Sequence, residues 1–188
     1  MTPRPSARLR IRQSALELLA RKGVAGTTTQ DIARRAQCSQ AAIYKYWDGK
    51  EALARTIFED ANRGLIEAME SRARGHPAPS ERALGALLGL VEFARAEPNP
   101  FAYLFHVFHS EHVLWTASRP VPRDVVLREL EAAVRLGEVS GEGLEVKTAL
   151  LLGMAIRLAF FERQKLLREP PEDTERVFLS AAAAVLES

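Results

Sequence analysis

Apolar residues recur three and four positions apart along nearly the whole chain, and no run alternates apolar and polar residues as a strand would. This spacing gathers apolar side chains on one face of a helix. Asp48-Gly49 is the one short hairpin signal. A chain of 188 residues suffices for one or two domains with a sizeable core. We therefore expect an all-α fold.

Helix start and stop signals divide the chain into about nine helices. Ser6, Thr28 and Ser39 are expected to cap the first three, which run over about 7–22, 29–36 and 40–47. Six further helices are expected at about 51–72, 80–97, 99–108, 124–136, 144–167 and 172–186.

Charge divides the chain near residue 50. Residues 51–188 carry 16 basic and 21 acidic side chains, net −5, whereas residues 1–50 carry three acids and ten bases, net +7. The bases are Arg4, Arg8, Arg10, Arg12, Arg21, Lys22, Arg34, Arg35, Lys45 and Lys50. A basic front end on an acidic body is typical of a module that meets a polyanion, although a solvated basic helix leaves the same pattern.

The sequence also excludes several protein classes. The one cysteine, Cys38, rules out an intramolecular disulfide framework and a Cys-rich zinc module. The N-terminus lacks the apolar core of a signal peptide. The longest apolar stretch, Thr148 to Phe161, is interrupted by Arg157 and is shorter than the roughly 18 residues that span a bilayer. We expect a cytoplasmic protein with no membrane contact.

Residues 28–47 have the features of a helix-turn-helix, the two-helix unit that reads DNA. Ile43 and Trp47, four positions apart, would fix the third helix onto the core. The helix N-termini at Thr28 and Ser39 would offer backbone N–H groups to phosphates. The side chains left on the outer side are Gln40, Ala41, Tyr44 and Lys45.

The stretch GVAGTTTQDIARRAQCSQAAIYKYWDGKEAL, residues 23–53, resembles the N-terminal domain of the tetracycline-repressor (TetR) family of transcriptional regulators. The matching positions are Gly23, Thr27-Thr28, Ile32-Ala33, Ala36, Ser39, Ile43-Tyr44, Trp47 and Lys50-Glu51-Ala52-Leu53. Three positions depart from the family pattern: Gln37 replaces the turn glycine, Cys38 a valine and Tyr46 a histidine. A left-handed backbone at Gln37 would cost more than at glycine.

The resemblance implies DNA-contact roles for several residues in and before this stretch. Thr28, Tyr44 and Lys50 would touch phosphates, while Gln40 and Ala41 would face base edges with Lys45 beside them. Glutamine pairs with adenine, and alanine meets a thymine methyl. The arm carrying Arg4 and Arg8 would reach a minor groove. The plainer alternatives are a core-edge Tyr44, a solvated Lys50 and a disordered arm.

The resemblance also implies a division into a helix-turn-helix DNA-binding domain, residues 1–50, and a helical ligand-binding and dimerisation domain, residues 51–188. A pocket among the middle helices would be lined by Phe105, His109, Trp115 and Phe160, for which plain core packing is the alternative. The last two helices look like the family's dimer face, and two copies would form a four-helix bundle. The residues expected there are Leu151, Ala155, Leu158, Ala159, Phe178, Ala181, Ala182 and Val185.

Three histidines, His106, His109 and His112, follow at three-residue spacing. His112 is rotated well round the helix from His106, so we expect no metal site, and no cofactor motif appears. A helical enzyme would have to use this cluster, because the chain shows no nucleophile–base pair or phosphate loop.

The sequence therefore predicts a ligand-responsive transcriptional regulator and not an enzyme. It would be a repressor that binds a palindromic double-stranded DNA operator as a homodimer and is released by a small, mainly apolar effector. The alternative is a non-sensing DNA-binding protein, which would carry basic charge along the body as well.

Overall fold

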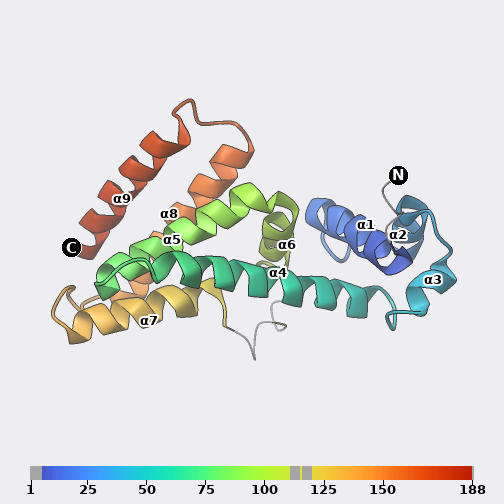
Figure 1. Ribbon diagram of the computed structural model, residues 1–188, viewed down its shortest axis with the longest axis horizontal. Helices are drawn as coiled ribbons and strands as arrows, with labels where there is room; N and C mark the ends of the chain where they lie inside the picture. The colour runs from blue at the N-terminus through green and yellow to red at the C-terminus, as the bar shows by residue number, and fades with distance from the viewer. Residues whose placement is uncertain (1–5, 111–114, 116–119, 188) are drawn as a thin grey trace. The chain divides into compact units, whose positions relative to one another are not determined.

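The computed structural model describes residues 6–110, 115 and 120–187, and these residues form nine α-helices and no strand (Figure 1). The expected all-α fold is confirmed. The helices are α1 (Ala7–Lys22), α2 (Thr29–Ala36), α3 (Gln40–Tyr44), α4 (Lys50–Ala73), α5 (Pro79–Ala96), α6 (Pro98–Phe108), α7 (Pro122–Arg135), α8 (Leu144–Arg163) and α9 (Pro171–Glu187).

Two helix ends differ from the prediction. The third helix stops at Tyr44 and not near Trp47, because the amides of Tyr46 and Trp47 both turn back to the Ile43 carbonyl at 3.0 Å. α8 stops at Arg163 and not near residue 167. There Lys165 adopts φ 55, and the next amide, that of Leu166, bonds back to the carbonyl of Phe161 at 2.9 Å. This is the closure that glycine usually provides at a helix C-terminus.

The start of α6 also differs, since the helix begins at Pro98 and not at the Asn99-Pro100 pair. Proline suits the first helical position, where its missing N–H has no partner in any case.

The chain packs as two compact units, and the division falls within α4 after Arg63. The first unit comprises residues 1–63 and 99–118, and the second comprises residues 64–98 and 119–188. These packing units do not follow the functional division at residue 50. That division concerns DNA binding against ligand binding, and it stays a prediction.

In the first unit, α6 and the N-terminal half of α4 complete the core begun by α1, α2 and α3. Tyr103 of α6 is fully buried, and its hydroxyl donates to the Ala54 carbonyl at 2.9 Å. Burial raises the pKa of this phenol above its usual range. His106 lies one turn further along α6, with Nε2 at 3.1 Å from the Ala20 carbonyl of α1. These two bonds fix α6 against α4 and α1.

In the second unit, α5 is the central helix, and it packs against α7, α8 and α9. Nearly every residue of α5 between Ala83 and Val91 is buried. Arg82 ties its N-terminal end to α7 through an ion pair of 2.7 Å with Glu129. α8 and α9 form a helical hairpin, drawn in orange and red in Figure 1. In this part of the chain, as in the rest that the structure describes, no helix combines the length and apolar character needed to cross a bilayer.

Arg95 joins three helices of the second unit. Its Nε and one terminal nitrogen donate to the two oxygens of Glu162 on α8, both at 2.7 Å. Its other terminal nitrogen donates to Glu175 on α9 at 2.5 Å. The hydrogen bonds with Glu162 raise the pKa of this guanidinium above its usual value. Such a bidentate arrangement is stronger and more directional than a single surface pair.

We expect Arg95→Met to lower the free energy of unfolding by about 1–2 kcal/mol, because it leaves two half-buried carboxylates facing each other. Urea unfolding of the full chain measures this loss. Arg176→Met is the matched control, since Arg176 is 73% exposed and pairs with Asp173 alone. Its expected cost is within about 0.5 kcal/mol. Equal costs for the two variants would contradict a joining role for Arg95.

Candidate nucleic-acid interface

Side-chain caps fix the N-termini of the two short helices, as the sequence predicts. The Thr28 hydroxyl accepts from the Asp31 amide at 3.1 Å and donates to its carboxylate at 2.8 Å. This hydrogen bond lowers the pKa of Asp31 below its usual value. The Ser39 hydroxyl accepts from the Ala42 amide at 3.3 Å. Both helix starts are therefore set by contacts within four residues.

The turn between α2 and α3 keeps a left-handed residue although glycine is absent. Gln37 adopts φ 52 and ψ 53, and the amide of Cys38 donates to the Ala33 carbonyl at 3.0 Å. A left-handed residue with a Cβ costs about 1–2 kcal/mol. Cys38 is half-buried in this turn. The departures from the family pattern thus leave the turn geometry intact.

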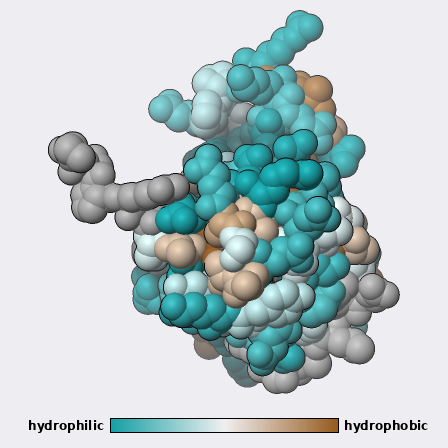
Figure 2. Space-filling view, turned by 90° about the vertical axis from the view of Figure 1, so that its right-hand side faces the viewer, coloured by the Kyte–Doolittle hydropathy of each residue, from teal (hydrophilic) through white to brown (hydrophobic). Residues whose placement is uncertain are grey.

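The outer face of α3 is built as predicted. Ile43 is fully buried and Trp47 is 7% exposed, so these two side chains anchor the helix. Four side chains of the predicted reading face are exposed, and Tyr44 is 56% exposed. They are Gln40, Ala41, Tyr44 and Lys45. The side of the molecule that carries α3 faces the reader in Figure 2, where hydrophilic residues surround a small hydrophobic cluster.

The cations predicted to contact DNA differ in how firmly they are held. The Lys50 ammonium donates to the Val24 carbonyl at 2.8 Å and lies 3.6 Å from Glu51. Arg8 is exposed, and its guanidinium lies over the Trp47 ring at 5.8 Å from the centroid. Arg4 lies outside the described residues. Thus one cation is anchored by the backbone and another rests on an aromatic ring.

Other basic side chains of this unit are already paired with acids. Arg35 pairs with Glu17, and Arg34 pairs with Asp31 at 2.6 Å. Arg12 pairs with Asp60 at 2.8 Å. These ion pairs neutralise part of the positive charge of the first unit. Fewer unpaired cations are therefore available on its surface than the number of basic residues indicates.

Thr29 is a residue of this surface that sequence reasoning missed. It is the first residue of α2, and its hydroxyl donates to Oε1 of Gln40, the first residue of α3, at 3.1 Å. The sequence contains no signal that pairs Thr29 with Gln40, eleven positions later and across a turn. It indicated only that Thr29 begins a helix, because Thr28 is recognisable as the cap.

The residues predicted to line a ligand pocket fall in both packing units. Phe105 is 9% exposed, and its ring contacts those of Phe101, Phe108 and His109. Trp115 packs against Phe58, with ring centroids 6.0 Å apart. These contacts are in the first unit, whereas Phe160 belongs to α8 in the second.

His106 of α6 and His109, which follows the helix, line a cavity of about 370 Å³ in the first unit. His109 is exposed, with Nδ1 at 3.0 Å from the Phe105 carbonyl. The other residues around the cavity are Lys22, Gly23, Val24, Ala25, His106 and Ser110. His112 lies outside the described residues, and within those described no three His, Cys, Asp or Glu side chains are grouped as metal ligands would be.

Most of the residues predicted for the dimer face serve the core of the protomer itself. Leu158 and Val185 are half-buried, Ala181 is exposed, and five others are buried. The buried five are Leu151, Ala155, Ala159, Phe178 and Ala182. Of these five, Phe178 also lines the groove between α8 and α9, and the face that would meet a second copy stays a prediction.

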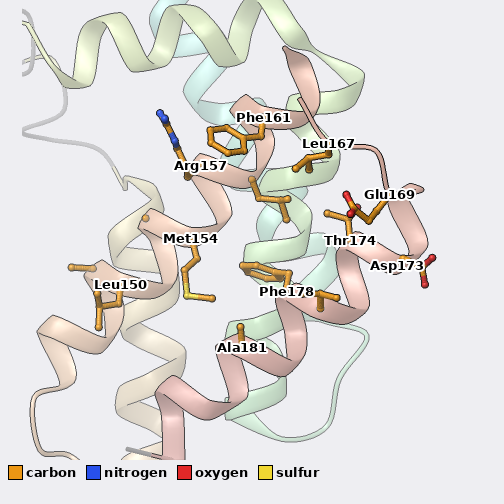
Figure 3. A pocket seen from close by; sticks show the side chains of 14 residues that line it. Leu150, Met154, Arg157, Phe161, Leu167, Glu169, Asp173, Thr174, Phe178 and Ala181 are labelled. Atoms are coloured by element: carbon orange, nitrogen blue, oxygen red, sulfur yellow. The ribbon is translucent and has the colours of Figure 1, made fainter. Parts of the chain in front are cut away.

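A groove of about 730 Å³ lies instead on the outer side of the α8–α9 hairpin (Figure 3). Leu150, Met154 and Phe161 line it from α8, and Phe178 and Ala181 line it from α9. Leu150 is 53% exposed. The hairpin thus presents a largely apolar surface, to which the predicted residues Leu158, Phe178 and Ala181 contribute.

The N-terminal segment matches a known family. Residues 11–57 match the model for bacterial regulatory proteins of the tetR family. An uncharacterised HTH-type transcriptional regulator of Bacillus subtilis (strain 168), YvkB, is 37% identical over 59 residues, which are 30% of this chain. That segment spans 31% of the length of YvkB.

The fold of the whole chain is similar to solved structures of the same family. A TetR family transcription regulator from Marinobacter aquaeolei VT8 superposes with a TM-score of 0.79 at 18% identity, over 97% of this chain and 96% of the other. A tetR-family regulatory protein from Rhodococcus RHA1 gives 0.79 at 20% identity, over 98% of each chain. Residues 11–57 are therefore the N-terminal domain of the tetR family of bacterial regulatory proteins, and the chain as a whole has the fold of that family's transcriptional regulators.

Proposed function

We propose that the protein is a cytoplasmic repressor that binds a palindromic double-stranded DNA operator as a homodimer. The exposed face of α3 carries this proposal. Gln40, Ala41, Tyr44 and Lys45 lie outward, while the buried Ile43 holds the helix in place. A short helix presented in this way fits a major groove.

The phosphate contacts of α2 follow from its cap. The single hydroxyl hydrogen of Thr28 is committed to the Asp31 carboxylate, so a phosphate at this end of α2 would meet backbone N–H groups. Lys50 is better placed to hold a second phosphate. Its ammonium has three hydrogens, and the bond to the Val24 carbonyl uses one of them.

The test is protection of DNA from nuclease. We expect the purified full-length chain to protect a palindrome upstream of its own gene, with the two half-sites about one helical turn apart. Protection that shows no sequence preference would support the alternative of a non-sensing DNA-binding protein.

The homodimer would form through the outer side of the α8–α9 hairpin. Val146, Leu150 and Val177 are 63%, 53% and 58% exposed, and most residues that line the groove between the helices are apolar, although Arg157, Glu169 and Asp173 line it as well. A second copy would bury this surface and build a four-helix bundle. A two-fold dimer of this kind matches a palindromic site.

We expect Leu150→Glu to convert the dimer to a monomer, because it places a charge within the apolar surface that the second copy would bury. Light scattering at micromolar concentration measures the mass. Leu136→Glu is the matched control, since Leu136 is 69% exposed at the end of α7 and does not line the groove. A wild-type monomer, or equal loss in both variants, would contradict this dimer face.

The effector would be a small, mainly apolar molecule whose binding changes the separation of the two DNA-reading heads. The ring of His109, which lines the cavity beside α6, stacks on that of Phe105, and this pair supports a contact there. A screen for compounds that release the protein from its operator would identify the effector. Phe105→Ala and His109→Ala should then lower the potency of that compound but not DNA affinity.

A further inference from the structure

The first residues of α2 and α3 are joined through their side chains. The hydroxyl of Thr29 donates to Oε1 of Gln40 at 3.1 Å. The neighbouring polar groups at the start of α2 are engaged elsewhere, since Thr28 and Asp31 bond to each other and Arg34 pairs with Asp31. The Thr29–Gln40 bond is thus a separate contact within the proposed DNA-reading surface.

This bond fixes the amide group of Gln40 in one orientation. Its carbonyl oxygen is turned toward Thr29, so its NH₂ group lies on the other side. Gln40 itself is exposed, and Thr29 is half-buried. A glutamine held by its acceptor end presents two N–H donors to whatever approaches. Because the rotamer is already selected, less conformational entropy is lost when a base edge binds.

The orientation matters because the bases differ in the groups they present. Bidentate pairing of glutamine with adenine requires Oε1 to accept from N6 while the NH₂ group donates to N7. The Thr29 hydroxyl uses one of the two lone pairs of Oε1 and holds this oxygen toward α2, so the amide must turn away from Thr29 before Oε1 can face N6 of adenine. Guanine presents two acceptors, N7 and O6, and it needs no acceptor from the protein.

Building on the proposed function, we propose that Thr29 is a positioning residue that sets the base preference of Gln40. With its carbonyl oxygen held by Thr29, Gln40 favours guanine over adenine at the base pair that it reads. Without that hydroxyl, the amide turns freely and bidentate pairing with adenine becomes available.

The experiment selects a randomised double-stranded DNA library with four full-length proteins: wild type, Gln40→Ala, Thr29→Val and Thr29→Ser. The position whose base preference disappears in Gln40→Ala is the one that Gln40 reads. The selected site is then titrated with each protein, carrying either guanine or adenine at that position. Thermal unfolding confirms that all four proteins fold.

We expect the wild type to prefer guanine, and the guanine-to-adenine affinity ratio to fall about tenfold in Thr29→Val. Thr29→Ser should keep the wild-type ratio, because it retains the hydroxyl. The proposal is overturned by a ratio in Thr29→Val equal to wild type, by the same loss in Thr29→Ser, by a wild-type preference for adenine, or by a Gln40→Ala variant that changes no position. A wild type that selects no sequence at all would instead overturn the proposed function itself.

Discussion

Replacing Tyr44 and Lys50 together by alanine is expected to weaken operator binding more than about tenfold and to make its salt dependence shallower by about one unit of slope. Tyr44 is 56% exposed at the end of α3, where its hydroxyl can donate to a phosphate. Lys50 contributes the charge, and losing one phosphate-bound cation releases one fewer counterion. Titration of labelled operator DNA at several salt concentrations measures both quantities.

The structure supplies the controls for this prediction. Arg55→Ala removes one positive charge from the same helix, but Arg55 is exposed and pairs with Glu59 one turn away. It should change affinity little. Tyr44→Phe separates the hydroxyl from the ring. Lys50→Ala also loses the bond to the Val24 carbonyl, so thermal unfolding must show that the domain stays folded. Unchanged affinity and slope in the double variant, or an equal loss in Arg55→Ala, would contradict phosphate contact by these residues.

Local signals made the start of the chain predictable. Ser6, Thr28 and Ser39 cap their helices through atoms only three residues ahead, and a cap of this kind is written in the sequence itself. The ends of α3 and α8 were not predictable in the same way. α3 ends where the amides of Tyr46 and Trp47 turn back to the Ile43 carbonyl, and α8 ends beside Lys165, which adopts a left-handed conformation that the usual glycine rule does not assign to it.

Helix α8 shows where apolar spacing no longer indicates which residues are buried. α8 is apolar nearly all round between Ala149 and Phe161, so several registers give an equally good stripe. Leu150, Leu151 and Leu152 are indistinguishable as residue types. The structure separates them, because Leu151 is fully buried while Leu150 is 53% exposed. The choice between them depends on where α5 and α9 pack, which a helix pattern does not contain.

The long-range contacts of the DNA-reading unit were equally inaccessible. Lys50 reaches Val24 across 26 positions, and Thr29 reaches Gln40 across the turn. The sequence named Lys50 and Gln40 for their residue types at the right spacing. It could not show that the first is anchored by a carbonyl and the second is held by a neighbouring hydroxyl. The hydrogen bonds of Lys50 and Gln40 are the basis of the variants proposed above to test DNA binding and base preference.

Gly89→Ala is expected to destabilise the protein by about 3 kcal/mol. Gly89 lies in the buried stretch of α5, at a point where this helix comes close to the backbone of α4. A Cβ there would stand 2.7 Å from the carbonyl oxygen of Ala68 and 2.8 Å from the Cα of Met69. Both are backbone atoms, so relief requires moving one helix away from the other. In an open helical position the same change normally gains up to about 1 kcal/mol, so the sign of the effect is itself diagnostic.

Gly153→Ala is the matched control, because Gly153 lies within α8 and a Cβ there would meet nothing within 4 Å. It should stabilise the protein by about 0.5–1 kcal/mol. Gly153 lines the α8–α9 groove, so both substitutions are best made in the Leu150→Glu background, where dimer formation does not contribute. Urea unfolding at one protein concentration then compares the two glycines directly. If Gly89→Ala were neutral or stabilising, the close approach of α5 to α4 could not be the reason that this position lacks a side chain.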